Sequence, residues 1–204
     1  GGLAKDFTLS GIVRKGGKLV MGGSWSIDSG AGPDDKFFVV TDQGEVVVFQ
    51  GADPSAAEWS YIGVYDIGKP MGSLAQIRAG GDVLIATNDG LVPLSEALTK
   101  DAAALKLSAV SRNIAPDWVR EARNRTAMPW AAIKWPEGGK AYVSLPVVAE
   151  GVEPLCFVVN LNTGAWCEYY GWDVRCFAEH DGNIYFGTSD GRVMQAEDTG
   201  MDGD

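Results

Sequence analysis

Short apolar runs separated by turn residues dominate the pattern of this chain. The stretch 154–196 contains four such runs, each rich in aromatic and β-branched residues, and a fifth closes it. The runs cover residues 155–159, 165–170, 174–177, 184–187 and 192–196. The segments between them are rich in Asn, Asp and Gly, which accept the positive φ angles of tight hairpins. The pattern therefore predicts a meander of antiparallel strands.

A Thr-x-x-Gly turn recurs between apolar runs along the chain. It is found at residues 41–44, 87–90 and 188–191. Gly44 and Gly90 are 46 positions apart, and the next equivalent turn is expected in the longer loop 146–154. Trp59 and Trp166 also stand at matching places, because each belongs to an aromatic strand that meets a glycine. Repeats of roughly 40 to 60 residues with four short strands are typical of β-propeller blades.

We therefore predict an all-β, β-propeller-like fold with about three and a half four-stranded blades. The expected strands are 18–21, 36–41, 45–50 and 60–65 in the first blade, 72–77, 82–87 and 91–93 in the second, 129–135, 140–145, 155–160 and 165–170 in the third, and a half blade over 173–196. A propeller needs about four to eight blades. The chain, residues 1–204, is therefore interpreted as a propeller segment of a longer protein.

Residues 94–125 depart from this pattern and are predicted to form a helical insert. Residues 94–110 keep a helical period, with Ser95 as the expected cap, and a second helix is expected over 117–125. The insert carries the positive cluster of the chain: Arg112, Arg120, Arg123 and Arg125. Two interpretations stay open at this point. The arginines either form a solvated face paired with Asp117 and Glu121, or they contact an acidic neighbouring subunit.

Composition narrows the functional classes. The 204 residues are 46% apolar and 22% charged, which is typical of a globular chain, and no run approaches the roughly 20 apolar residues of a membrane span. With 17 basic and 27 acidic residues, the net charge is −10. An acidic protein does not release counterions from DNA as a binder does, so tight or sequence-specific DNA binding is disfavoured.

The loop 24–35 is similar to two ligand-binding motifs but fits neither. A Ser-x-Asp-x-Gly sequence at 26–30 begins like the Asp-box of sialidase-type propellers, but Pro33 stands where an aromatic residue should close it. The acids of the loop also lack the regular spacing with which carboxylates wrap calcium. These acids are Asp28, Asp34 and Asp35. We expect them to face water or to cap backbone amides.

No residue pattern indicates catalysis. His180 is the only histidine and is expected to lie exposed in a turn. The sequence indicates no residue that would act with it in catalysis. Three cysteines are expected to be free thiols of the core in a protein folded in a reducing cytosol: Cys156, Cys167 and Cys176. The sequence predicts no catalytic, cofactor-binding or metal-binding residue, and we expect the protein not to be an enzyme.

Four tryptophans are expected to fill the spaces between neighbouring blades, since wedge-shaped gaps suit large flat side chains. They are Trp130, Trp135, Trp166 and Trp172. A carbohydrate-binding or carbohydrate-cleaving propeller that acts on a bacterial surface is the alternative function. It would require such rings to be exposed, beside a pair of carboxylates.

A resemblance to a known family rests on four sequence segments: GGSWSIDSGAGPDDKFFVVTDQGEVVVFQ, GGDVLIATNDGLVPLSEAL, FVVNLNTGAWCEYYGWDVRCF and IYFGTSDGRVMQAEDTG. They resemble virion proteins of short-tailed bacteriophages, in particular the propeller-bearing tail proteins that form the nozzle or hub below the portal and adaptor. The resemblance implies a structural part of a six-fold ring in the virion tail, through which DNA is ejected. It implies copies of the chain, the adaptor and the tail fibres as partners, folding in the host cytoplasm, and no cofactor.

A conduit for DNA must not hold what it passes, so an acidic wall would suit it. Five loop acids are the candidates for that wall: Asp28, Asp34, Asp35, Glu58 and Glu179. The arginines of the helical insert would then meet neighbouring subunits.

Overall fold

The computed structural model describes residues 7–28, 33–51, 53–146 and 151–198. Strands account for 46% of the chain and helices for 14%, and the strands form four small antiparallel sheets. Sheet I contains β1 (Leu19–Asp28), β2 (Pro33–Thr41), β3 (Glu45–Gln50) and β4 (Ser60–Asp66), and sheet II contains β5 (Gln76–Ala79), β6 (Asp82–Thr87) and β7 (Gly90–Pro93). Sheet III contains β8 (Ala131–Trp135), β9 (Lys140–Leu145), β10 (Leu155–Asn160) and β11 (Trp166–Tyr170), and sheet IV contains β12 (Val174–His180), β13 (Asn183–Thr188) and β14 (Val193–Gln195). The prediction of an all-β fold is confirmed.

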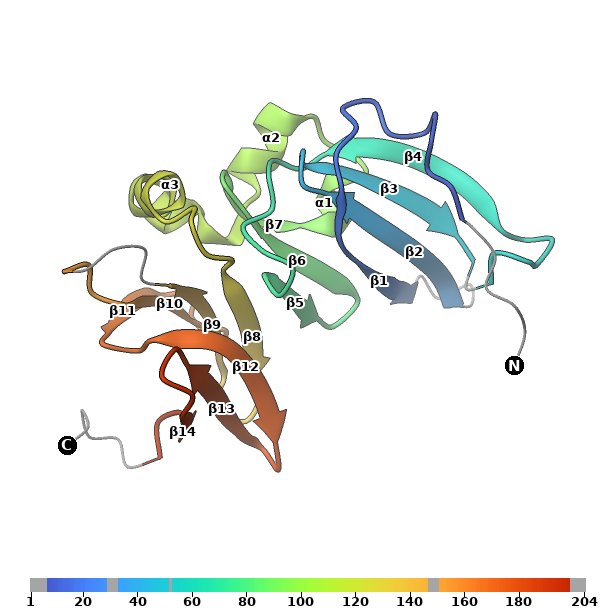
Figure 1. The fold of residues 1–204 in the computed structure, drawn as a ribbon. Coiled ribbons are helices and arrows are strands. Elements are labelled where there is room, and N and C mark those ends of the chain that lie inside the picture. Colours follow the sequence, from blue (N-terminus) through green and yellow to red (C-terminus); the bar gives the residue numbers. More distant parts are fainter. Residues whose placement is uncertain (1–6, 29–32, 52, 147–150, 199–204) are drawn as a thin grey trace.

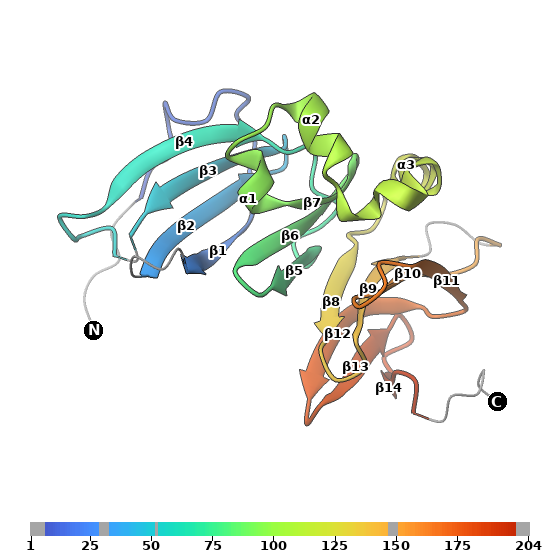
Figure 2. The ribbon, with the colours of Figure 1, turned by 180° about the vertical axis from the view of Figure 1, so that it is seen from behind.

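The four sheets follow one another along an arc, as Figures 1 and 2 show. In each sheet the strands are hydrogen-bonded in chain order, and the first strands β1, β5, β8 and β12 lie toward the concave side of the arc. β5 packs beside β8, and β8 packs beside β12. Small sheets placed side by side with their first strands innermost are arranged as propeller blades are. The described residues form an open arc and not a closed ring.

The sheet boundaries differ from the prediction in three places. The first strand of sheet II, β5, covers Gln76–Ala79 and not the expected 72–77, and the expected half blade at the end is a three-stranded sheet. In sheet I, β1 extends to Asp28, through residues that were expected to form a loop. The reason is that Met21 and Trp25 both point into the core, so the alternation of a strand continues, and the ring of Trp25 lies 5.8 Å from that of Phe38.

The recurring turns close as expected. The hydroxyl of Thr41 accepts a hydrogen bond from the N–H of Glu45 at 3.2 Å, and the hydroxyl of Thr188 accepts one from the N–H of Arg192 at 3.1 Å. Gly44 has a φ of +83°, a left-handed conformation that a side chain would strain. The turns connect the second and third strands of sheets I, II and IV, and the loop 146–154 occupies the same place in sheet III.

The helical insert is divided into shorter pieces than expected. It contains α1 (Leu94–Ala97), α2 (Ala102–Leu107), η1 (Val110–Ile114) and α3 (Ala115–Asn124). The single helix predicted over 94–110 is wrong, because Asp101 accepts a hydrogen bond from the N–H of Ala104 and caps a new helix there. Ser95 does not cap α1, since its hydroxyl instead donates to Asp82 Oδ2 at 2.6 Å.

Apolar side chains form a separate core layer at each junction between sheets. One layer joins sheets I and II around Trp25 and Phe38, the next joins sheets II and III around Trp118 of α3 and Trp130, and the third joins sheets III and IV around Tyr142. A fourth layer lies on the other face of sheet I, where the segment 7–18 covers it. Burying each large apolar side chain contributes roughly 1.5–3 kcal/mol, so these layers hold the arc together. In the described part of the chain, no helix has the length and apolar character needed to cross a membrane.

Candidate interaction surfaces

Tryptophans fill the junction between sheets II and III. Trp130 is fully buried, its ring lies 5.4 Å from that of Trp118 in α3, and its indole N–H donates to the carbonyl of Arg125 at 2.9 Å. Trp166 is half-buried and packs edge-on against Trp118 with 6.2 Å between the ring centroids, so its neighbour is the helix α3. Sequence reasoning did not single out Trp118, although its position inside an amphipathic helix indicates a core contact.

The junction between sheets III and IV is aromatic as well. Trp172 stacks on Phe186 of β13 at 5.1 Å and on Tyr142 of β9 at 5.9 Å. The indole N–H of Trp135 donates to the carbonyl of Gly182 at 2.6 Å, which ties β8 to the hairpin of sheet IV. The predicted role of the four tryptophans in packing is therefore confirmed. All seven tryptophans lie in the described residues and none is exposed.

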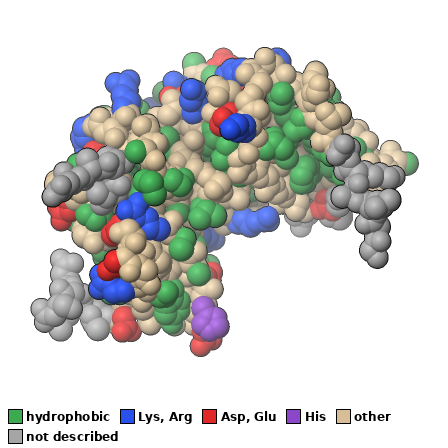
Figure 3. Space-filling view, viewed as in Figure 1, with side chains coloured by type: hydrophobic (Ala, Val, Ile, Leu, Met, Phe, Trp, Pro, Cys, Tyr) green, Lys and Arg blue, Asp and Glu red, His purple; other side chains and the backbone are tan. Residues whose placement is uncertain are grey.

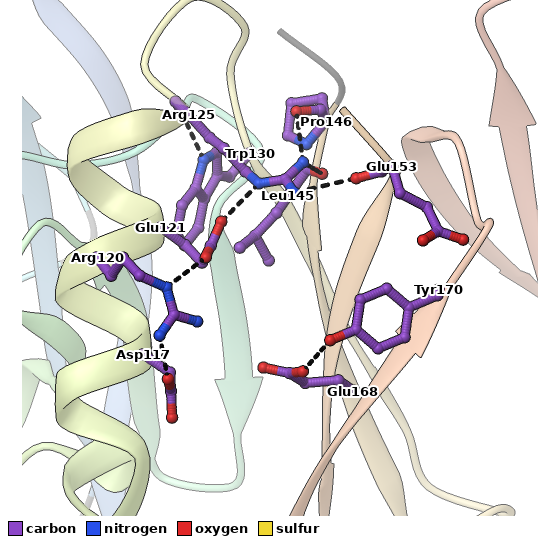
Figure 4. A network of polar contacts seen from close by, with 10 residues as sticks. All are labelled: Asp117, Arg120, Glu121, Arg125, Trp130, Leu145, Pro146, Glu153, Glu168 and Tyr170. Carbon is purple, nitrogen blue, oxygen red and sulfur yellow. Dashed lines mark hydrogen bonds and ion pairs between the residues drawn. The ribbon is translucent and has the colours of Figure 1, made fainter. Parts of the chain in front are cut away.

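The arginines of the helical insert do not act as one cluster. Arg125 is buried, and its Nε donates to Glu121 Oε2 at 2.8 Å. Its terminal nitrogens donate to the carbonyls of Leu145, Pro146 and Glu153 at 3.3, 3.4 and 3.0 Å (Figure 4). Arg125 therefore ties α3 to the two ends of the β9–β10 connection, and it is not available to a neighbouring subunit.

The other arginines of the insert lie at the surface. Arg120 forms ion pairs with Asp117 and, at 2.9 Å, with Glu121 (Figure 4). These contacts agree with the interpretation that the arginines pair with acids of their own helix. Arg112 and Arg123 are exposed, and neither has an ion-pair partner among the described residues. They are the only members of the predicted cluster that keep an unpaired charge for a partner.

The five acids proposed for a channel wall are not gathered in one place. Asp28 and Asp34 lie at the end of the β1–β2 hairpin, and their side chains are outside the described part of the structure. The carboxylate of Asp35 accepts from the hydroxyl of Ser26, and Glu58 is exposed in the connection before β4. Of the acids whose side chains are described, Glu179 alone lies on a first strand, at the concave side of the arc.

A shallow hollow of about 290 Å³ opens on the concave side where β5, β8 and β12 approach one another. Its lining combines apolar residues with the polar side chains of Gln76, Arg78, Lys134 and Glu179. Arg78 is exposed, and its guanidinium donates to the carbonyl of Ser24 at 3.0 Å. Sequence reasoning missed Arg78 and Lys134, which are 56 positions apart and become neighbours only because β5 and β8 pack side by side.

A second polar cluster closes the outer end of the junction between sheets III and IV. Glu197, with a left-handed φ of +54°, accepts from the hydroxyls of Tyr142 at 2.7 Å and Tyr169 at 3.1 Å, and it pairs with Lys140. Burial alone would raise the pKa of Glu197, but the hydrogen bonds from Lys140 and the two tyrosines hold it below its usual value. Burial and the neighbouring Glu197 raise the pKa of Tyr142. The cluster joins the end of sheet IV to sheet III.

The thiols and the histidine offer no paired nucleophile. All three cysteines are free, but only Cys156 is buried, so the expectation of three core thiols is wrong for Cys167 and Cys176. Cys167 is exposed because β11 is the outer edge strand of its sheet, and Cys176 is exposed on the face of β12 that points away from sheet III. Burial raises the pKa of the Cys156 thiol.

His180 is exposed at the end of β12, as expected, and its ring centroid lies 6.5 Å from that of Tyr185. Among the described residues, no three His, Cys, Asp or Glu side chains gather as a metal site would require.

Comparison with known proteins gives no family assignment: no family model and no curated protein matches the chain.

Proposed function

We propose that this chain is a structural component of a bacteriophage virion, in the tail nozzle or hub through which DNA is ejected. The observation that carries the proposal is the arc of four small sheets, which are stacked side by side with their first strands along the concave side. The four sequence segments that resemble propeller-bearing tail proteins support the same role. In this role the chain acts by its shape and its contacts, needs no cofactor and is not an enzyme.

The surface left open at one end of the arc supports assembly with other subunits. Sheet IV packs on sheet III through one face, while its other face carries Cys176, Ala178 and Val193 at the surface. Val193 is 74% exposed. Exposed apolar side chains at a sheet face are typical of interaction surfaces. We propose as partners copies of the chain in a ring, with six-fold symmetry, together with the adaptor and the tail fibres, in the virion tail after folding in the host cytoplasm.

The carbohydrate-directed alternative gains no support from the tryptophans. A tryptophan platform for a sugar requires an indole ring open to solvent, whereas every tryptophan is buried or half-buried in the layers between sheets or on sheet I. DNA enters the proposal as a polymer that passes through the ring and is not bound by sequence, in keeping with the net charge of −10.

The proposal is tested in the particle. Mass spectrometry of purified virions should detect the chain in a fixed ratio to the portal protein, and a reconstruction of the tail should place the four-sheet arc in a ring around the axis. Absence of the chain from purified particles would overturn the proposal. A glycan-binding screen of the isolated chain tests the alternative, for which selective binding to bacterial surface glycans is the expected result.

A further inference from the structure

The concave side of the arc carries two cations that form no ion pair with the acids of the described residues. Arg78 lies on β5 and Lys134 on the neighbouring β8, at the rim of the same hollow. Most of the described lysines and arginines form ion pairs with carboxylates, whereas neither of these two has such a partner within the described residues. In a chain of net charge −10, two such cations beside the single carboxylate of Glu179 give the hollow a local excess of positive charge.

Arg78 is held in place for such a role. Its Nη1 donates to the carbonyl of Ser24 in β1, which fixes the guanidinium across the junction between sheets I and II. The guanidinium lies against the backbone of β1, since a Cβ placed at Gly23 would be in van der Waals contact with Nη2 at 3.4 Å. One of the five N–H donors of the guanidinium is used by Ser24, and the remaining donors stay available to an anion. A pre-oriented guanidinium loses less conformational freedom on binding than a free one does.

We propose that the concave face contacts the phosphate backbone of double-stranded DNA through Arg78 and Lys134. This inference rests on the proposed function, because it takes the concave side as the side that faces the DNA. Figure 3 shows basic side chains on the underside of the arch formed by the sheets. Phosphate oxygens accept hydrogen bonds from a guanidinium in bidentate geometry and from an ammonium as a point charge.

We expect this contact with DNA to be weak, because few charges take part in it. Two cations face one carboxylate, Glu179, at the hollow, so the local excess is a single positive charge. Two phosphate contacts correspond to a slope of about −1.8 in a plot of log affinity against log salt concentration. Such a contact aligns the duplex without holding it, and it carries no information on base sequence. For this face of the subunit, the proposal differs from the expectation that loop acids form the wall of the channel.

The test is fluorescence anisotropy of a labelled 30-base-pair duplex titrated with the full chain at several salt concentrations. We expect binding that is independent of sequence, with a slope of about −1.8. Lys134→Glu should weaken binding several-fold and flatten the slope by about 1, and the double variant with Arg78→Glu should abolish binding. The side chain of Lys134 makes no hydrogen bond or ion pair with the described residues, so its variant is expected to fold even where Arg78→Glu does not.

A matched pair of charge reversals controls for net charge. Lys18→Glu with Lys69→Glu changes the charge equally at exposed lysines beside the 41–44 and 87–90 turns, outside the hollow. That variant should keep the binding and the slope of the original chain. Loss of binding in both double variants, or no binding by the original chain at low salt, would overturn the contact. Neither result bears on whether the chain is found in the tail, which the particle experiment decides separately.

Discussion

Sheets I and IV stand at the two ends of the arc, and they differ in how many of their faces are covered. Sheet I packs on sheet II through one face, and the segment 7–18 covers its other face through Leu9, Ile12 and Val13. Sheet IV packs on sheet III through one face, and none of the described residues covers the other. A sheet with two covered faces buries more apolar surface per strand. We therefore expect sheet I to be the stable end of the arc and sheet IV the end that opens first.

The two ends are also fastened by different carboxylates. Glu45, almost fully buried, accepts from the N–H groups of Arg14 and Lys15 at 2.9 and 2.7 Å and pairs with the guanidinium of Arg14 at 3.4 Å. Glu197 is less buried and binds side chains of sheet III. Glu45 thus joins the segment 7–18 to sheet I, and Glu197 joins the residues after β14 to sheet III. The difference in burial predicts that the fastening at sheet I is the stronger of the two.

The largest expected effect comes from an aromatic residue of sheet I. Phe38 is 1% exposed between sheets I and II, and Phe38→Ala should lower the free energy of unfolding by about 3–5 kcal/mol through lost contacts and a cavity. Phe177 of sheet IV is half-buried, so Phe177→Ala is the matched variant and should lose less than half as much. Urea unfolding of both variants measures this. Equal losses would mean that the two ends are equally well packed.

The next effect concerns the segment 7–18. Glu45→Ala removes the acceptor of two backbone N–H groups and of a guanidinium, which should cost about 1.5–3 kcal/mol. Trypsin should then cleave after Arg14 and Lys15 faster than in the original chain. Glu58→Ala, at an exposed carboxylate, is the control and should change neither quantity. An unchanged cleavage rate in the Glu45 variant would show that the apolar contacts alone hold the segment.

A pH-dependent effect is expected at sheet IV. The pKa of Glu197 is lowered in the folded state, so its contribution to stability is fully present above the ordinary glutamate pKa of about 4.3 and is lost as the pH falls through the lowered value. Glu197→Gln should therefore be less stable than the original chain at neutral pH, by about 1–2 kcal/mol, with the gap closing in acid. Thermal melts of both proteins from pH 7 to pH 3 measure the gap. A gap that does not change with pH would rule out this role of the carboxylate.

The smallest effect on the isolated chain is expected at the open face of sheet IV. Val193 is 74% exposed, so Val193→Ser should change the stability by no more than about 0.5 kcal/mol. Val47, buried on the covered face of sheet I, is the matched position, and Val47→Ser should cost clearly more because it buries a hydroxyl. If the open face meets a neighbouring subunit, Val193→Ser should still reduce incorporation into particles. Normal incorporation would show that the face stays open.

The strands and their turns could be predicted because their causes are local. Alternating or continuous apolar residues gave β3, β6, β9 and β10 within one residue of their observed bounds. Glycines such as Gly44 mark turns because few other residues adopt a positive φ without strain. The helical insert was predicted less well, because Ser95 and Asp101 both have the chemistry of a cap, but the hydroxyl of Ser95 donates to Asp82 while Asp101 caps α2. Capping propensity alone cannot rank two residues that are equally suited to begin a helix.

The contacts that join the sheets could not be derived from the pattern. Arg125 resembles any other arginine of the insert in sequence, but it is buried against the carbonyls of a loop that begins 20 residues later. Cys167 lies in an apolar run but is exposed, because no further strand of the described residues is paired with the outer edge of sheet III. Burial of an edge residue depends on what lies beyond the edge, and that is a property of the stacked sheets.

The order of apolar and turn residues along this chain is enough to set its strands, its hairpins and its all-β class, because backbone sterics and side-chain alternation act over a few residues. Other features follow from how the sheets stack. They are the meeting of Arg78 and Lys134 at one hollow, the exposed face of sheet IV and the covered face of sheet I. Stacking is set by the fit of large side chains such as Trp118 and Trp172 between layers, and that fit depends on residues far apart in the chain.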